Sequence, residues 1–194
     1  MKIEIRKLTP DLVQDYIYFF DVTPHDDHKE EYKCYCVMWS SDNCEGKDFS
    51  SAQKRRSYAS NYVMNNYLQG YLAYLDGKVV GWCNANTKAD CLHSMGWTNF
   101  MNFVPLDNID LKVESIFCFV VAPEMQRKGI ATKLLERVCE DAKKEGYDLL
   151  EAYPYKENAF TASSFAGYLE MYLKCGFEII KETDIGFVMR KYIK

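Results

Sequence analysis

The stretch from residue 112 to residue 146 constrains the fold more than any other part of the chain. Its first ten residues are rich in β-branched and aromatic side chains and are apolar on both faces after Ser115, which predicts an inner strand of a sheet. Pro123 follows, and residues 130–145 then place apolar and charged side chains at helical spacing. We therefore expect a buried strand, a short turn and an amphipathic helix that stops at Gly146.

The turn between this strand and this helix, residues 126–131, predicts an anion-binding site. A helix N-terminus carries unsatisfied backbone N–H groups and a partial positive charge, which favour a phosphate. Arg127 and Lys128 add formal charge, Gly129 lets the backbone approach an anion, and small Ala131 permits close packing. The chain has neither the P-loop pattern nor the G-x-G-x-x-G pattern, which disfavours a nucleotide triphosphatase or a dinucleotide fold.

Two motifs in this region resemble those of the GNAT superfamily of N-acetyltransferases. The first, V-x-P-x-x-Q-x-x-G-x-A from Val121 to Ala131, is similar to the family's acetyl-CoA signature. The second, Y-x-K-x-G-F from Tyr172 to Phe177, resembles the end of the family's last helix. The resemblance covers most of the chain and implies an enzyme that moves an acetyl group from acetyl-CoA to a primary amine by direct attack.

The resemblance also implies which residues bind the cofactor. Backbone amides of the turn and of the first helical turn would hold the pyrophosphate, and the end of the strand would pair with the pantetheine arm. The alternative is an ordinary helix start with two solvated cations. The cofactor-binding residues implied are Phe119, Val120, Val121, Gln126, Arg127, Lys128, Gly129, Ile130, Ala131 and Thr132.

Three side chains are candidates for moving protons. Glu114 in the apolar strand and Glu151 in an expected strand at 147–153 resemble, at two different places, the family's carboxylate that accepts the amine's proton. Tyr172 matches the family tyrosine that protonates the departing thiolate. Each has a structural alternative, since a carboxylate can form an ion pair or face water and a tyrosine can be a core residue.

The remaining pattern predicts an α/β (α+β) architecture. Asp76-Gly77 between two apolar runs is a strong hairpin signal. The resulting order of elements is that of the GNAT fold, a central mixed, mostly antiparallel sheet of about seven strands with helices on both faces. Expected strands are 2–7, 71–75, 78–83, 112–121, 147–153, 177–181 and 185–192, and expected helices begin after Thr9, Ser51, Gly129 and either Ser163 or Ser164.

Two long segments, 21–50 and 84–111, lack such a pattern and are expected to be insertions in a single domain spanning 1–194. The first contains Cys34, Cys36, Met38 and Trp39, which we expect to line the substrate groove or pack under it. The second is a candidate lid over the substrate, because its apolar residues need burial or a ligand. These residues are Trp97, Phe100, Met101 and Phe103.

Composition narrows the possible partners. A net charge of −4 and a pI near 5.5 disfavour nucleic acid. No stretch approaches the ~20 apolar residues of a membrane span, and residues 1–6 alternate like a strand, which indicates a cytoplasmic protein. The eight cysteines are then expected to be free thiols. His25, His28, Cys34, Cys36 and Cys44 match no usual zinc spacing, so we expect no metal.

The acceptor is not specified by the sequence. The aromatic insertions favour a small-molecule amine over a peptide, while a protein N-terminus or a lysine remains an alternative. Two further alternatives are a sensor that binds acyl-CoA without turnover and a metal-binding regulatory protein. The acyl chain length is also open, as is the choice between a monomer and a homodimer.

Overall fold

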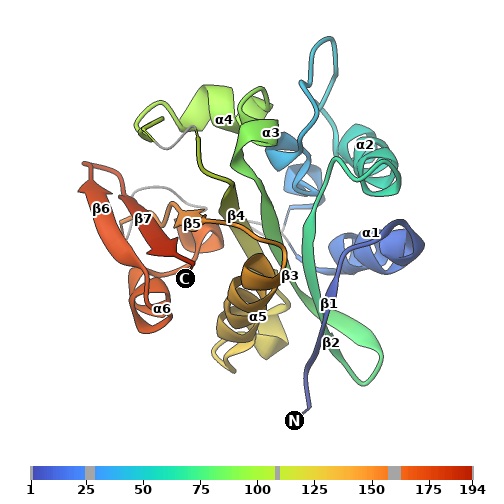
Figure 1. Ribbon diagram of the computed structural model, residues 1–194. Coiled ribbons are helices and arrows are strands. Elements are labelled where there is room, and N and C mark those ends of the chain that lie inside the picture. The colour runs from blue at the N-terminus through green and yellow to red at the C-terminus, as the bar shows by residue number, and fades with distance from the viewer. Residues whose placement is uncertain (1, 25–28, 108–109, 157–162, 194) are drawn as a thin grey trace.

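The computed structural model describes residues 2–24, 29–107, 110–156 and 163–193. One sheet of seven strands has the order β1-β2-β3-β4-β5-β7-β6 (Figure 1). Neighbouring strands are antiparallel except for β4 and β5, which are parallel, so the expected mixed, mostly antiparallel sheet is confirmed. The strands are β1 (Glu4–Lys7), β2 (Gly70–Leu75), β3 (Lys78–Thr87), β4 (Val113–Val121), β5 (Leu149–Ala152), β6 (Glu178–Glu182) and β7 (Phe187–Tyr192).

Helices cover both faces of this sheet. Gly81 in β3 packs against α5, whereas the next residue, Trp82, meets Tyr16 of α1 edge-on at 4.9 Å between ring centroids. Because successive strand residues point to opposite faces, α1 and α5 lie on opposite sides. The helices are α1 (Val13–Val22), α2 (Ala52–Met64), α3 (Lys88–Cys91), α4 (Met95–Phe100), α5 (Ile130–Lys144) and α6 (Leu169–Lys174). Short 3₁₀ turns are η1 (Pro10–Leu12), η3 (Glu30–Tyr32), η4 (Val37–Trp39), η5 (Pro123–Met125) and η6 (Ser163–Ala166).

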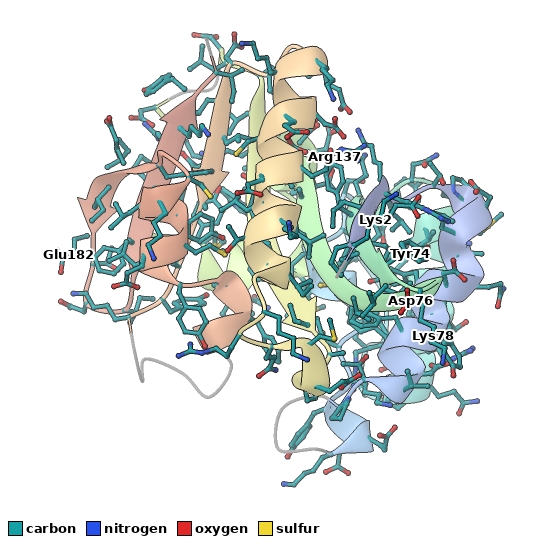
Figure 2. The ribbon with its side chains drawn as sticks, turned by 90° about the horizontal axis from the view of Figure 1, so that it is seen from below. Lys2, Tyr74, Asp76, Lys78, Arg137 and Glu182 are labelled. Carbon is teal, nitrogen blue, oxygen red and sulfur yellow. The ribbon has the colours of Figure 1, made fainter. Side chains whose placement is uncertain are left out.

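Helix α5 is fastened to the edge of the sheet by a long side chain. Arg137 donates through a terminal guanidinium nitrogen to the carbonyl of Ile5 in β1 at 2.7 Å. Figure 2 labels Arg137 on α5, and it labels Asp76 and Lys78 at the hairpin between β2 and β3. Asp76 and Gly77 both have positive φ, 50° and 77°, as the predicted two-residue turn requires.

Several predicted boundaries are confirmed and others are wrong. Ser51 caps α2 by accepting from the Lys54 N–H at 3.2 Å, as expected. The last helix does not begin at Ser163 or Ser164, because Gly167 adopts φ +81° and separates the 3₁₀ turn η6 from α6. Strand β3 extends four residues past its predicted end at Cys83.

The segment 84–111 is more ordered than its sequence pattern suggests. After the end of β3 it forms α3 and α4, and the Ser94 hydroxyl caps α4 by accepting from the Trp97 N–H at 3.1 Å. Trp97 and Met101 are buried, whereas Phe100 is 46% exposed. Among the described residues, no helix combines the length and apolar character needed to cross a bilayer.

Candidate functional site

Strands β4 and β5 part in the middle of the sheet. Their parallel pairing ends at Ile116 and Ala152, but β4 continues to Val121 alongside β3. Phe117 is an extra residue at a bulge, since Ala85 pairs with Ile116 and Asn84 pairs with Cys118. Residues 117–121 therefore have β3 on one side, and on the side where β5 has ended no described strand pairs with them. Such an edge can hydrogen bond to an extended, amide-containing ligand.

The turn after β4 brings backbone N–H groups to the same place. Arg127 and Gly129 adopt positive φ of 60° and 78°, and Gly129 caps α5 without a side chain. The first helical hydrogen bond comes from the Lys133 N–H to the Gly129 carbonyl at 3.0 Å. The N–H groups of residues 130–132 thus have no intrahelical acceptor. Apart from its two chain neighbours, no described residue has an atom within 4 Å of a Cβ built on Gly129. We call this turn the anion cradle, because its geometry is one that can hold an anion.

A groove of about 240 Å³ joins the open edge of β4 to this cradle. Of the ten cofactor residues predicted from sequence, Val120 and Lys128 do not line it, since the buried Val120 side chain belongs to the other face of β4 and Lys128 is exposed. The other eight line it: Phe119, Val121, Gln126, Arg127, Gly129, Ile130, Ala131 and Thr132.

The opposite wall of the groove was missed by the sequence reasoning. It comes from the residues just before α6 and from the first part of this helix. The Y-x-K-x-G-F motif covers only the end of the helix. Because the sequence pattern predicts one continuous helix from Ser163 or Ser164, these residues could not be assigned to the groove without the fold. They are Phe165, Gly167, Tyr168 and Met171, and Met125 of η5 adds to the floor.

Tyr172 lies behind this wall. Its side chain is fully buried, and its hydroxyl donates to the Ala166 carbonyl at 2.9 Å. Burial raises the pKa of Tyr172 well above its ordinary value, so the phenol keeps its proton. To protonate a thiolate in the groove, the hydroxyl would have to leave the Ala166 carbonyl, and this role remains a prediction.

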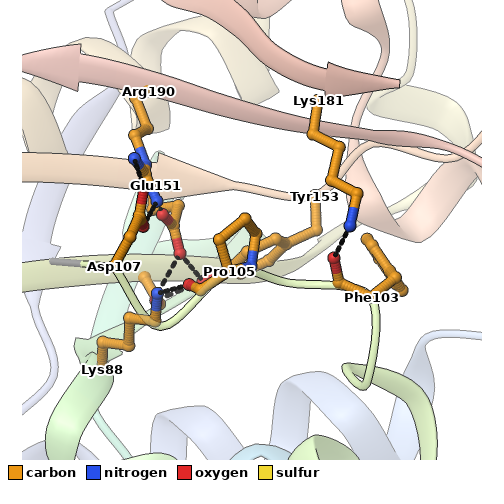
Figure 3. Close-up of polar contacts among 9 residues, drawn as sticks. Lys88, Phe103, Pro105, Asp107, Glu151, Tyr153, Lys181 and Arg190 are labelled. Carbon is orange, nitrogen blue, oxygen red and sulfur yellow. Dashed lines mark hydrogen bonds and ion pairs between the residues drawn. The ribbon is translucent and has the colours of Figure 1, made fainter. Parts of the chain in front are cut away.

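Glu151 lies at the centre of a buried ion network (Figure 3). One carboxylate oxygen accepts from the Lys88 ammonium at 2.6 Å and from the Tyr153 hydroxyl at 2.8 Å, and the other accepts from Arg190 Nε at 2.7 Å. The Glu151 side chain is fully buried, and those of Lys88 and Arg190 are 5% exposed. Both carboxylate oxygens are engaged by these donors and Glu151 does not line the groove, so this arrangement does not favour Glu151 as the base.

Asp107 completes the charge balance of this network. It accepts from the Arg190 guanidinium at 2.5 Å and 3.2 Å. The hydrogen bond to Arg190 lowers the pKa of Asp107, and the same bond raises the pKa of Arg190. Two carboxylates therefore face two cations, and Lys88 and Asp107 both come from the segment 84–111. The network fastens this segment to β5 and β7, and Lys181 adds a bond to the Phe103 carbonyl at 3.0 Å.

Glu114 does not line the groove. It lies near Tyr71 on the α5 side of β4, whereas the next residue, Ser115, hydrogen bonds to the Tyr153 hydroxyl at 2.7 Å on the other side. Glu114 is 3% exposed, and its Oε2 has no hydrogen-bond partner among the described residues. At about 3.3 Å per residue it lies roughly 10 Å from Phe117, where the open edge begins. This placement does not favour Glu114 as the base, and that role remains a prediction.

The surroundings of Glu114 predict a pH-dependent stability instead. Burial raises the pKa of Glu114 to about 8, with smaller effects from charges on Lys7, Glu145, Asp141 and Lys112. The folded state therefore keeps a proton that the unfolded state has lost once the pH exceeds about 4.5. Stability from this group is fully present below that pH and is lost as the pH rises through about 8.

We expect Glu114→Gln to be more stable than the parent at pH 9, by on the order of 2 kcal/mol after the cost of a buried amide is included. At pH 5 the variant should be equally stable or less stable, because the parent carboxyl is then neutral. Urea unfolding at both pH values measures the difference. Glu140→Gln, at an exposed position on α5, is the control that should show no such reversal. A fall of kcat by about 10²–10⁴ with unchanged stability would instead support the role as base.

The cysteine-rich insertion forms no metal site among the described residues. The Cys36 N–H donates to the Cys34 sulfur at 3.4 Å, and the Trp82 indole donates to the Cys36 sulfur at 3.3 Å. Cys44 is buried elsewhere, and no disulfide joins the cysteines of the described residues. His25 and His28, which completed the candidate ligand set, lie outside the described residues.

Comparison with known proteins gives a consistent picture. The model of the Acetyltransferase (GNAT) family matches residues 13–177. None of the curated proteins matches. Solved structures match over nearly the whole chain at low identity, and they therefore establish similarity of fold alone.

Three of these structures illustrate the likeness. The GNAT-family acetyltransferase from Streptococcus pneumoniae has 15% identity and a TM-score of 0.55, with 100% of both chains covered. The PaiA N-acetyltransferase from Thermoplasma acidophilum, solved in complex with coenzyme A, has 18% identity, a TM-score of 0.55 and 99% coverage of both chains. YncA from Salmonella typhimurium, solved with acetyl-CoA, has 13% identity and a TM-score of 0.53, with 99% of this chain and 94% of that chain covered.

Proposed function

The chain belongs to the GNAT family of acetyltransferases, so it is an acetyl-CoA-dependent N-acetyltransferase, and we propose that its acceptor is the primary amine of a small molecule. Binding of acetyl-CoA is supported by the groove that runs from the open edge of β4 to the start of α5, and the acceptor class is supported by the packing of the two insertions. The groove begins at the edge of β4, where no described strand pairs with residues 117–121, and ends at the anion cradle. A pantetheine arm followed by a pyrophosphate would need the two features in this order.

The groove fits coenzyme A in chemical character. The N–H groups of residues 130–132 and the guanidinium of Arg127 would hold the pyrophosphate, because N–H donors and positive charge converge at this helix start. The open edge of 117–121 would hydrogen bond to the amides of the arm, and apolar Phe119 and Met171 would exclude water from it. Bound acetyl-CoA supplies a thioester carbonyl carbon that an amine can attack.

The transfer forms one N–C bond and breaks one C–S bond. The attacking nitrogen loses a proton and the departing sulfur gains one, so the reaction needs a path for each proton. Tyr172 is our candidate donor to the sulfur, if its hydroxyl leaves the Ala166 carbonyl. With Glu114 enclosed and Glu151 paired to two cations, we assign removal of the amine's proton to water that accompanies the acceptor.

The choice of a small amine rests on the two insertions. On the face of β4 opposite α5, η4 brings Trp39 against Phe117, and α4 brings Trp97 against the same ring. The segment 84–111 is held there by the ion network around Glu151. Side chains from both insertions thus occupy the surface on which an extended peptide would have to lie. A protein amine and a sensor without turnover are the alternatives.

Release of free thiol from acetyl-CoA, measured over a panel of acceptors, tests this proposal. We expect turnover with small primary amines and little with peptides bearing a free N-terminus or an internal lysine. Turnover with peptides alone would overturn the acceptor class but not the enzyme. Binding of acetyl-CoA without turnover on any acceptor would support the sensor alternative.

A further inference from the structure

Three aromatic rings form a stack across the place where β4 and β5 part. Trp39 of η4 lies on Phe117 with ring centroids 5.0 Å apart and planes 12° apart. Phe117 lies in turn on Tyr153, which follows β5, at 5.8 Å and 23°. We call Trp39, Phe117 and Tyr153 the aromatic stack. It connects an insertion, the bulge of β4 and the end of β5 in one rigid unit.

The inner members of the aromatic stack are fixed in position. Phe117 and Tyr153 are buried, and the Tyr153 hydroxyl is held between Ser115 and Glu151 at 2.7 Å and 2.8 Å. Trp97 packs edge-on against both rings, at 6.3 Å and 6.1 Å. A ligand therefore cannot reach these two rings without unfolding the site.

Trp39 is the outer member and remains partly exposed. Its indole is held on a second side by Gly96 of α4, where an added Cβ would lie 2.5 Å from Cε3 of the ring. Its carbonyl accepts from the Asn84 side chain at 3.3 Å. Phe100, 46% exposed, lies 6.3 Å from the indole. Trp39 and Phe100 thus form an aromatic surface of which the Phe100 ring and part of the indole are exposed.

The charges near this surface do not suit an acceptor with several cationic groups. Both carboxylate oxygens of Glu151 are used by Lys88, Tyr153 and Arg190, and Asp107 is paired with Arg190. Lys88 also lies 5.5 Å from the Trp97 ring, which places a cation under the surface. Recognition of the acceptor by its planar apolar part is therefore favoured over recognition by charge.

We propose that Trp39 determines the specificity of the enzyme for its acceptor and selects amines joined by a short linker to a planar apolar group. The inference rests on the proposed function. Trp39 is one ring away from Phe117, the residue at which the open edge of β4 begins. A planar group stacked at Trp39 would thus hold its amine near the part of the groove that receives the acetyl end of the cofactor.

The test compares kcat/KM for 2-phenylethylamine with kcat/KM for hexylamine, two primary amines of similar length. We expect the parent enzyme to prefer 2-phenylethylamine by about two- to tenfold, the range that an aromatic pair contributes. Trp39→Leu should abolish this preference, whereas Trp39→Phe, which keeps a ring, should retain most of it. Phe100→Leu, at a more exposed position, should reduce the preference and should fold even if Trp39→Leu does not.

Tyr18→Leu is the matched control, because Tyr18 is 66% exposed on α1. It should leave the ratio unchanged. The inference is overturned if the parent enzyme turns over both amines without preference, or if folded Trp39→Leu or Phe100→Leu keeps the parent ratio. If neither these amines nor any other acceptor releases thiol while acetyl-CoA still binds, the proposed function itself fails, and that result is distinct from a loss of preference.

Discussion

Replacing Glu151 by glutamine is expected to lower the free energy of unfolding by about 3–5 kcal/mol, the range for removing one partner of a buried ion pair. The carboxylate is fully buried and accepts from Lys88, Arg190 and Tyr153. A neutral amide cannot balance two buried cations, and its NH₂ group would face a donor where the carboxylate offered an acceptor. The loss should therefore exceed that of a single hydrogen bond.

Urea unfolding at neutral pH measures this effect, and a matched control uses an exposed pair. Glu182 on β6 faces Lys156 at 2.7 Å with both side chains well exposed, so Glu182→Gln should cost less than about 1 kcal/mol. Combining Glu151→Gln with Lys88→Met removes one of the unbalanced cations, and the double variant should be more stable than the sum of the two single changes predicts. Additive effects would mean that the ion network is not a coupled unit.

The same variant separates a structural Glu151 from a catalytic one. A residue that acts only as base would leave the unfolding transition in place and lower kcat by about 10²–10⁴. The ion network predicts instead that the main effect of Glu151→Gln is a loss of stability, and that any fall in kcat accompanies this loss. Because Lys88 and Asp107 belong to the segment 84–111, the loss should be accompanied by looser attachment of this segment, seen as faster amide exchange of α3 and α4.

The strands were predictable because their signals are local. Alternation at 2–7, the Asp76-Gly77 turn and the long apolar run ending at Val121 each depend on neighbouring residues, and β1 to β4 lie at these places, with β3 longer than predicted. The predicted start of the last helix was wrong because local signals alone do not determine it. Ser163 and Ser164 look like caps, but α6 begins only after Gly167, which has a positive φ and where an added Cβ would lie 2.9 Å from Met171 and 3.0 Å from Tyr172.

The turn at the start of α5 and the ion network around Glu151 also differ in how far local sequence could predict them. The turn at the start of α5 is contiguous in sequence, so the motif between Val121 and Ala131 could predict an anion site there. The ion network was not visible, because Lys88, Asp107, Glu151 and Arg190 are far apart in sequence and meet only once the sheet order is fixed. A carboxylate in a strand could equally be a base, an ion-pair member or an isolated buried acid, and sequence alone did not separate Glu114 from Glu151.

Replacing Gly129 by valine is expected to weaken acetyl-CoA binding by roughly 100-fold or more. Gly129 has φ +78°, a conformation that a β-branched residue adopts only with strain, and its Cβ would project into the open cradle. If the turn relaxes instead, the N–H groups of residues 130–132 move away from the phosphate. Losing two charge-assisted hydrogen bonds at about 1.5–3 kcal/mol each is enough for this effect.

The chain contains a matched control for the backbone strain. Gly77 in the β2–β3 hairpin has φ +77°, and a Cβ built on it also has no atom within 4 Å. Gly77→Val should therefore carry a similar conformational cost without touching the groove, and calorimetric titration should give the parent affinity for acetyl-CoA. If folded Gly129→Val also binds with the parent affinity, the pyrophosphate lies elsewhere. If both variants lose affinity, the loss reflects general destabilisation, because Gly77 does not line the groove.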